Sequence, residues 1–243
     1  MCMNFEIIDN ADIGSRYHIN RIIRNEIKII EIGEFDYDYY DFVIIYFMFG
    51  KQTDDEIIEL INQYRQKTIC IIGCVKEISD DDILYPDDVF MNFFDLYFYP
   101  MTDLEVEDLI QVCFLNRGGD QHGDPQDWIF EKSAVSFYSE TGKSLDEATD
   151  AIKKRHEYIR NIIKTSKYIS PEIKNSELKH NRAIIAFLSN GMENILQQTA
   201  KSIAVLSQYL TVDASLFYFY QEDNKSIEKG FCKIVFILGE LIY

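Results

Sequence analysis

The apolar run FVIIYFMF, at residues 42–49, is the feature from which the fold can be argued. A run of this length without polar alternation suits a central strand that is buried on both faces. TICIIGCV, at residues 68–75, has the same character, and an amphipathic pattern over 54–66 separates the two runs. Buried strands separated by helices predict an α/β protein with a mostly parallel sheet sandwiched by helices.

Capping residues predict where three of the helices begin. Each has a Ser or Thr before its first turn, the residue type that can accept a hydrogen bond from a free backbone N–H group. The caps and expected helices are Thr53 before 54–66, Thr102 before 103–115 and Ser144 before 145–159. Glu105 and Glu147 complete the capping-box spacing for the last two. Further helices are expected at 16–25, 127–133 and 194–210, and further strands at 5–9, 27–32, 95–99, 134–138, 183–188, 215–220 and 231–238.

A glycine- and aspartate-rich loop divides the chain. It reads GGDQHGDPQD at residues 118–127, and no other stretch is as dense in loop signals. We therefore expect an α/β domain over 1–117 and a smaller α/β domain with a mixed sheet over 118–243. In the second domain the strands at 215–220 and 231–238 are expected to be joined by a hairpin-like polar loop.

The charge balance argues against two classes of partner. A formal net charge of −17 is unfavourable for binding nucleic acid or an anionic membrane surface, since both need clustered Lys and Arg. No apolar run approaches the ~20 residues that span a bilayer, and the N-terminus has no signal-peptide pattern. Five cysteines, an odd number, suggest a reducing compartment. We expect a cytoplasmic protein.

The residues needed for most site chemistry are missing from the sequence. A phosphate site needs glycines where backbone approaches phosphate, and the two relevant turns carry only Gly14 and Gly50. Asp54 and Asp55 would repel a phosphate at the second turn. The four histidines are scattered along the chain, so no metal site is expected, and no nucleophile has a base nearby.

Asp124 and Asp127 are the remaining candidates. In one interpretation, Asp124 forms a turn with Pro125 while Asp127 caps the following helix. In the other, the two carboxylates project from an exposed loop and polarise a water molecule or bind a cation. The second interpretation needs a partner molecule, because this chain supplies no electrophile.

Several segments of the first half resemble the tubulin/FtsZ family. IIDNADIGSRYHINRIIRNEIKIIEI resembles the opening strand, the glycine-rich GGGGxNAVN turn and the next strand, with Gly14 and Asn20 near the matching positions. DFVIIYFMFGKQTDDE resembles the strand that leads into the signature GGGTGTG; Gly50 and Thr53 match, whereas other residues replace most glycines. TICIIGCV and DLYFYPMTDLEVEDL resemble the next two strands.

The second half resembles the family in the order of its elements. HGDPQDWIFEKSAVSFYSETGKSLDEATDAIKK is similar to the NxDxxD loop with the strand and helix that follow it. In that family this loop inserts over the GTP of the next subunit, and its acids promote hydrolysis. His122, Asp124 and Asp127 would correspond, with His in place of the asparagine. The chain is shorter than the family, lacking a strand–helix block between Ile32 and Asp41 and much of the central helix.

The resemblance implies a degenerate, non-catalytic FtsZ-like protein. Without the signature glycines we expect no bound GTP, no other cofactor and no metal; Gly14, Asn20, Gly50 and Thr53 would be vestigial nucleotide positions. The expected partners are FtsZ/tubulin-like subunits or further copies of the chain, in cell division or another filament-like assembly. Two alternatives stay open: an acidic interaction module, and a small α/β enzyme with a receiver- or flavodoxin-like first half.

Overall fold

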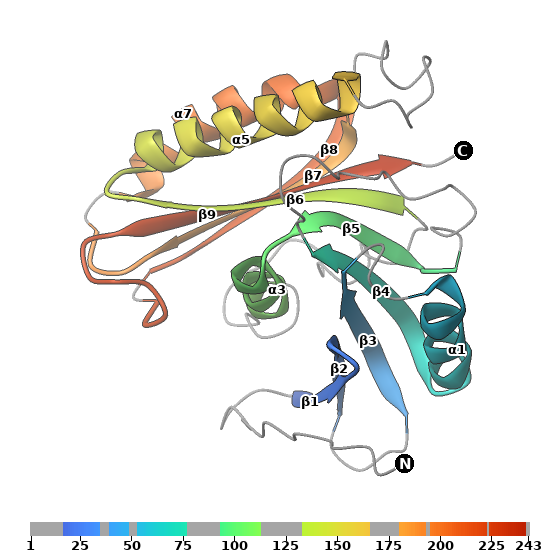
Figure 1. Ribbon diagram of the computed structural model, residues 1–243. Helices are drawn as coiled ribbons and strands as arrows, with labels where there is room; N and C mark the ends of the chain where they lie inside the picture. The colour runs from blue at the N-terminus through green and yellow to red at the C-terminus, as the bar shows by residue number, and fades with distance from the viewer. Residues whose placement is uncertain are drawn as a thin grey trace.

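In the residues that it describes, a computed structural model of the chain shows a twisted sheet of nine strands with helices on both faces (Figure 1). The structure describes residues 17–34, 39–48, 53–76, 93–112, 133–165, 180–192, 195–222 and 224–241. The expected strand at 5–9 and the expected helix at 127–133 lie outside the described residues. The fold class expected from the sequence is confirmed, since the first half carries parallel strands between helices and the second half has a mixed sheet.

The strands lie in the order β1-β2-β3-β4-β5-β6-β9-β7-β8. Their bounds are β1 Tyr17–Arg24, β2 Ile27–Glu34, β3 Tyr40–Phe47, β4 Thr68–Lys76, β5 Leu96–Met101, β6 Ser133–Gly142, β7 His180–Ser189, β8 Leu210–Gln221 and β9 Cys232–Leu241. The helices are α1 Asp54–Tyr64, α3 Asp103–Ile110, α5 Leu145–Thr165 and α7 Ile195–Leu206, followed by a short 3₁₀ helix, Ser207–Tyr209.

The helix expected at residues 16–25 is wrong, because this segment forms strand β1. It pairs antiparallel with β2 along its whole length, from Tyr17 opposite Glu34 to Arg24 opposite Ile27. Asn25 and Glu26 make the connection with positive φ angles of 50° and 67°. Two consecutive residues of positive φ are typical of the tight turns that match the twist of a hairpin. The isoleucines pack in the sheet, where their branched side chains are favoured.

Strands β3, β4, β5 and β6 form a parallel block at the centre of the sheet. Phe42–Phe47 is buried throughout, as expected for a central strand. β5 does not end at residue 99 as expected, because the strand continues through Pro100 to Met101. The register of β4 and β5 shifts at this point: Cys74 lies opposite Phe98, and Lys76 opposite Met101. Such an irregularity accommodates a proline, which cannot donate a ladder hydrogen bond.

The second half does not contain the expected hairpin between its last two strands. Strand β9 pairs antiparallel with both β6 and β7, while β8 pairs parallel with the other side of β7. β7 therefore lies between β8 and β9. Side-chain alternation could place these strands in a sheet but could not specify which neighbours they pair with, because several apolar strands compete for each position.

Helices cover the two faces of the sheet unequally. α3 packs on one face, in a core that also includes Phe98, Phe137 and Ile184 and so joins both halves of the chain. α1 packs on the opposite face of the first half. α5 and α7 cover that same face in the second half, where they lie side by side (Figure 1). The boundary expected at residue 117 falls outside the described residues and stays a prediction.

Candidate functional site

The carboxyl ends of the parallel strands are where α/β folds commonly bind ligands. At this edge of the sheet, two lysines flank one carboxylate: Lys28 Nζ, from the start of antiparallel β2, lies 2.7 Å from Asp103 Oδ1, and Lys76 Nζ, from the end of β4, lies 3.3 Å from Asp103 Oδ2. These hydrogen bonds, that from Lys28 first, lower the pKa of Asp103. Lys28 Nζ also lies 5.5 Å from the ring centre of Tyr46. Both ammonium groups are thus already paired with a carboxylate.

The N-terminus of α1, which follows β3, is closed by its own side chains. Thr53 Oγ1 accepts from the Glu56 N–H group at 3.3 Å, and Glu56 Oε2 accepts from the Thr53 N–H group at 3.2 Å. This is a complete capping box, which satisfies two N–H groups that could otherwise bind an anion. Asp55 and Glu56 are exposed in the same turn and give it a negative charge. The expected cap by Thr53 is confirmed.

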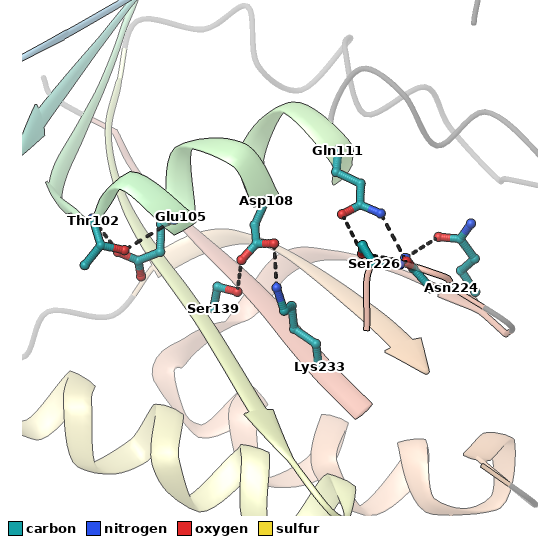
Figure 2. A network of polar contacts seen from close by, with 9 residues as sticks. Thr102, Glu105, Asp108, Gln111, Ser139, Asn224, Ser226 and Lys233 are labelled. Carbon is teal, nitrogen blue, oxygen red and sulfur yellow. Dashed lines mark hydrogen bonds and ion pairs between the residues drawn. The ribbon is translucent and has the colours of Figure 1, made fainter. Parts of the chain in front are cut away.

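A seam of polar contacts joins α3 to the second half of the sheet (Figure 2). Asp108 accepts hydrogen bonds from Lys233 of β9 at 2.6 Å and from Ser139 of β6 at 2.5 Å. Just beyond α3, Gln111 bonds to Asn224 and Ser226 in the connection between β8 and β9, at 3.3 Å each. The seam therefore holds three separate elements of the second half against one helix of the first.

A second set of contacts extends the seam to α5. Arg155 lies 2.7 Å from Glu105 Oε1, donates to Glu105 Oε2 at 2.9 Å, and lies 3.7 Å from Glu140. The contact with Oε2 is a charge-assisted hydrogen bond, whereas buried Oε1 lies within ion-pair distance of the guanidinium without accepting a hydrogen bond. Burial nevertheless raises the pKa of Glu105, and the Arg155 charge only partly offsets that effect. Glu105 also accepts from the Thr102 N–H group at 2.8 Å, which confirms the capping box expected there.

The structure brings together two histidines that the sequence had separated. His156 of α5 and His180 of β7 are buried with ring centres 6.3 Å apart, so they are not scattered as expected. Tyr138 Oη lies 2.9 Å from His156 Nδ1, and the Tyr209 ring is tilted by 45° against the His156 ring, with the two ring centres 4.1 Å apart. Burial lowers the pKa of both histidines to about 4. The only sequence signal was that His156 lies on the apolar face of its helix.

No metal site is present among the described residues, where no three His, Cys, Asp or Glu side chains are grouped to hold an ion. Ser144 caps α5 through a 3.2 Å bond from the Glu147 N–H group, as expected. The Glu147 carboxylate accepts instead from the Lys143 N–H group at 2.8 Å, one residue before the position that a capping box requires.

Within the described residues, no helix is long and apolar enough to cross a membrane.

Two of the residues named from the sequence are described. Asn20 lies in β1 and donates to Glu31 of β2 at 2.7 Å, and Glu31 also accepts from Tyr64 at 2.7 Å. Thr53 is the N-cap of α1, the helix that follows β3. His122, Asp124 and Asp127, together with Gly14 and Gly50, lie outside the described residues.

Comparison with known proteins identifies the fold. No protein-family model matches the sequence, and no curated protein is significantly similar to it. A solved structure of the empty FtsZ dimer from M. jannaschii superposes with a TM-score of 0.54 at 10% identity, covering 83% of this chain and 64% of that one. The chain has a tubulin/FtsZ-like fold. A point mutant of the same FtsZ gives a TM-score of 0.53 at 11% identity, covering 83% of this chain and 66% of that one.

The comparison and the strand order test two expectations from the sequence: that the chain is shortened, and that its first half could be flavodoxin-like. This chain spans less than two thirds of the length of the FtsZ chains it resembles, in line with the shortening inferred from the sequence. The first five strands that the structure describes lie in sequential order and begin with an antiparallel hairpin. A flavodoxin-like sheet has the order 2-1-3-4-5 instead, so the structure contradicts that alternative for the first half.

Proposed function

We propose that the protein is a non-catalytic FtsZ/tubulin-like protein that binds no GTP at its own strand ends and works through protein contacts in a filament-like assembly. Cell division is the process in which we place it. The FtsZ-like fold supports a cytoskeletal type of protein. The observation that carries the proposal is the closed N-terminus of α1, because the family's nucleotide signature lies in the turn between β3 and this helix.

A phosphate at this turn would have to displace the Glu56 carboxylate from the Thr53 N–H group. It would also meet the negative charges of Asp55 and Glu56, which are solvated and exposed. Losing a cap of this kind costs a helix about 0.5–2 kcal/mol, and like-charge contact weakens binding further. The family's motif has glycines here, whose backbone N–H groups are open to phosphate; this sequence has Lys51 and Gln52.

The nearby lysines do not compensate for the missing glycines. Lys28 and Lys76 share Asp103, so these three groups together carry one net positive charge. A nucleotide triphosphate carries several negative charges and would have to compete with Asp103 for both lysines. We therefore expect the strand ends to disfavour GTP even though lysines are present.

A titration of thermal stability with GTP and GDP, each with Mg²⁺, tests the nucleotide proposal. We expect no increase in Tm with either nucleotide, with ATP as the control for non-specific binding. A ligand at 100 times its Kd would stabilise the folded state by about 2.7 kcal/mol, which is easily measured. Clear stabilisation by GTP or GDP but not ATP would contradict the proposal.

The loop acids provide the contact that we propose to remain functional. Asp124 and Asp127 would face the nucleotide of a neighbouring FtsZ-like subunit, as the family's NxDxxD loop does. We expect Asp124→Ala and Asp127→Ala to leave the Tm of this protein nearly unchanged and to weaken its co-sedimentation with GTP-bound FtsZ-like filaments. Asp150→Ala, at an exposed acid of α5, is the control. A large loss of Tm in either loop variant would show that the loop is structural instead.

A further inference from the structure

Strand β8 is the last strand in the order of the sheet, and within the described residues it pairs only with β7. An edge strand offers backbone N–H and C=O groups to any further strand that approaches it. Proteins usually protect such edges with charged side chains, prolines or bulges. The opposite edge, β1, follows this pattern: it carries Arg21 and Arg24, and Arg21 is held by Glu107 at 2.7 Å.

β8 lacks this protection over most of its length. Its regular pairing with β7 runs from Ser215 opposite Arg182 to Gln221 opposite Leu188. That run reads SLFYFYQ and contains no charged residue, glycine or proline, in a chain that is 27% charged. The irregular register lies before it, between Leu210 and Ser215, and includes Val212 and Asp213. The unprotected run is therefore bounded by Asp213 on one side and Glu222 on the other.

The side chains of this run are incompletely covered on both faces. Tyr218 is 60% and Tyr220 50% exposed on the face that carries α5 and α7, and Phe217 is 37% exposed on the face of α3. None of the side chains from 215 to 221 is fully buried. Another strand alongside β8 would cover aromatic rings on both faces and add a row of backbone hydrogen bonds to the sheet.

The run is complementary to itself. If two copies pair antiparallel about Tyr218, Leu216 of one copy lies opposite Tyr220 of the other, and Phe217 opposite Phe219. Opposite residues of antiparallel strands share a face, so apolar side chains meet on both faces and no charge meets a charge within the run. An acidic or basic partner peptide would find no opposite charge in these residues. The occupant that fits is a second copy of the same strand.

We propose that β8 is a homotypic docking edge through which Ser215–Gln221 of two copies pair antiparallel about Tyr218. The sheet then continues across a two-fold axis and the interface closes on itself, which gives a dimer and not an open filament. This inference does not rest on the proposed function, because it involves neither a nucleotide nor residues 53–56.

Sedimentation of the full chain over a range of concentrations, with Tyr218→Lys and a matched control, tests the docking edge. In the variant, two lysines would face each other at the two-fold axis, so we expect the dimer Kd to rise at least tenfold. Val212→Lys makes the same change of charge at a side chain that is 107% exposed and lies outside the run, so it should dimerise like the wild type. A wild type that stays monomeric, or a Tyr218→Lys variant that dimerises unchanged, would overturn the proposal.

The salt dependence and a cross-link test the interface independently. Because Asp213 and Glu222 flank the run, raising the salt concentration should leave the dimer unchanged or strengthen it; a dimer that dissociates in salt would contradict an apolar edge. Tyr218→Cys should form an intermolecular disulfide under mild oxidation, since opposite Cα atoms lie about 4.5–5.5 Å apart. Val212→Cys should not. A wild-type dimer without the Tyr218→Cys cross-link would overturn the proposed register.

Discussion

At the scale of single residues, polar side chains determine how α3 sits on the second half of the sheet. Asp108 accepts hydrogen bonds from both Lys233 and Ser139. The Asp108 and Lys233 side chains are only 9% and 19% exposed. A charge in such a place is costly unless it is paired. The Asp108 carboxylate and the Lys233 ammonium group therefore each offset the cost of burying the other's charge.

Removing Asp108 should destabilise the protein more than removing an exposed acid. We expect Asp108→Ala to lower the free energy of unfolding by about 2–4 kcal/mol, because Lys233 is left buried without its carboxylate. Lys233→Met in the same background should recover part of the loss. Asp146→Ala breaks the exposed Lys201–Asp146 pair and should cost less than about 1 kcal/mol. Urea unfolding of the wild type and these three variants checks this; equal losses for Asp108→Ala and Asp146→Ala would contradict it.

The buried histidines predict a pH dependence. The pKa of His156 is about 4 when folded and about 6.5 when exposed, so the unfolded chain binds more protons between these values. Stability should be complete above pH 6.5 and fall as the pH drops towards 4, by up to about 3 kcal/mol for this residue. Coulombic repulsion from His180, and then from Arg160, lowers the pKa of His156 further.

His156→Gln isolates this effect from the titration of carboxylates. Its unfolding free energy should decline less than that of the wild type between pH 6.5 and 4.5, as measured by urea unfolding at several pH values. Equal slopes for the two proteins would mean that His156 is not the group responsible. His180 has the same lowered pKa of about 4, so some pH dependence should remain in the variant.

At the scale of elements, helix starts were predictable because their signals are local. Thr53 and Thr102 each begin a complete capping box, and the residues that form it lie within four positions of one another. The buried strands were equally readable, since Phe42–Phe47 has no polar alternation. Strand β1 could not be predicted, because the spacing of its apolar residues fits a helix as well as a strand. Only the Asn25–Glu26 turn and the pairing with β2 decide between the two.

The hydroxyl group of Thr102, which caps α3, should contribute to the stability of the protein. We expect Thr102→Ala to cost about 0.5–2 kcal/mol, because the Glu105 N–H group loses its acceptor at 3.3 Å. Thr102→Ser keeps the hydroxyl and should cost only a few tenths of a kcal/mol. Thermal unfolding of both variants makes the comparison. A serine variant as unstable as the alanine variant would indicate that the methyl group matters instead.

The candidate site was predictable only where it is made of neighbours in sequence. The Thr53 cap and the acids beside it could be read directly. The Lys28–Asp103–Lys76 group could not, since it joins three elements whose proximity depends on the strand order. The same holds for His156 and His180, which come together across a helix and a strand. Long-range pairing, and not residue chemistry, was the missing information.

At the scale of the whole molecule, the core under α3 extends across both halves. Phe98 of β5 stacks edge-on against Phe137 of β6 at 6.1 Å, and both belong to the cluster that contains Ile184 and Ile237. A core shared in this way couples the two halves energetically. We expect native-state hydrogen exchange in urea to show β4 and β7 becoming exposed in one common transition. Two transitions at clearly different urea concentrations would show independent domains.

The position of β9 has a consequence for how the chain is made. β9 lies between β6 and β7 and pairs with each along most of its length, yet it leaves the ribosome after both. Until it emerges, the two older strands have unpaired sides that face each other across a missing strand. Helices α5 and α7 can dock only on an incomplete sheet during that time. The second half should therefore acquire its structure late in synthesis, and chains interrupted before residue 232 should depend on chaperones to stay unaggregated.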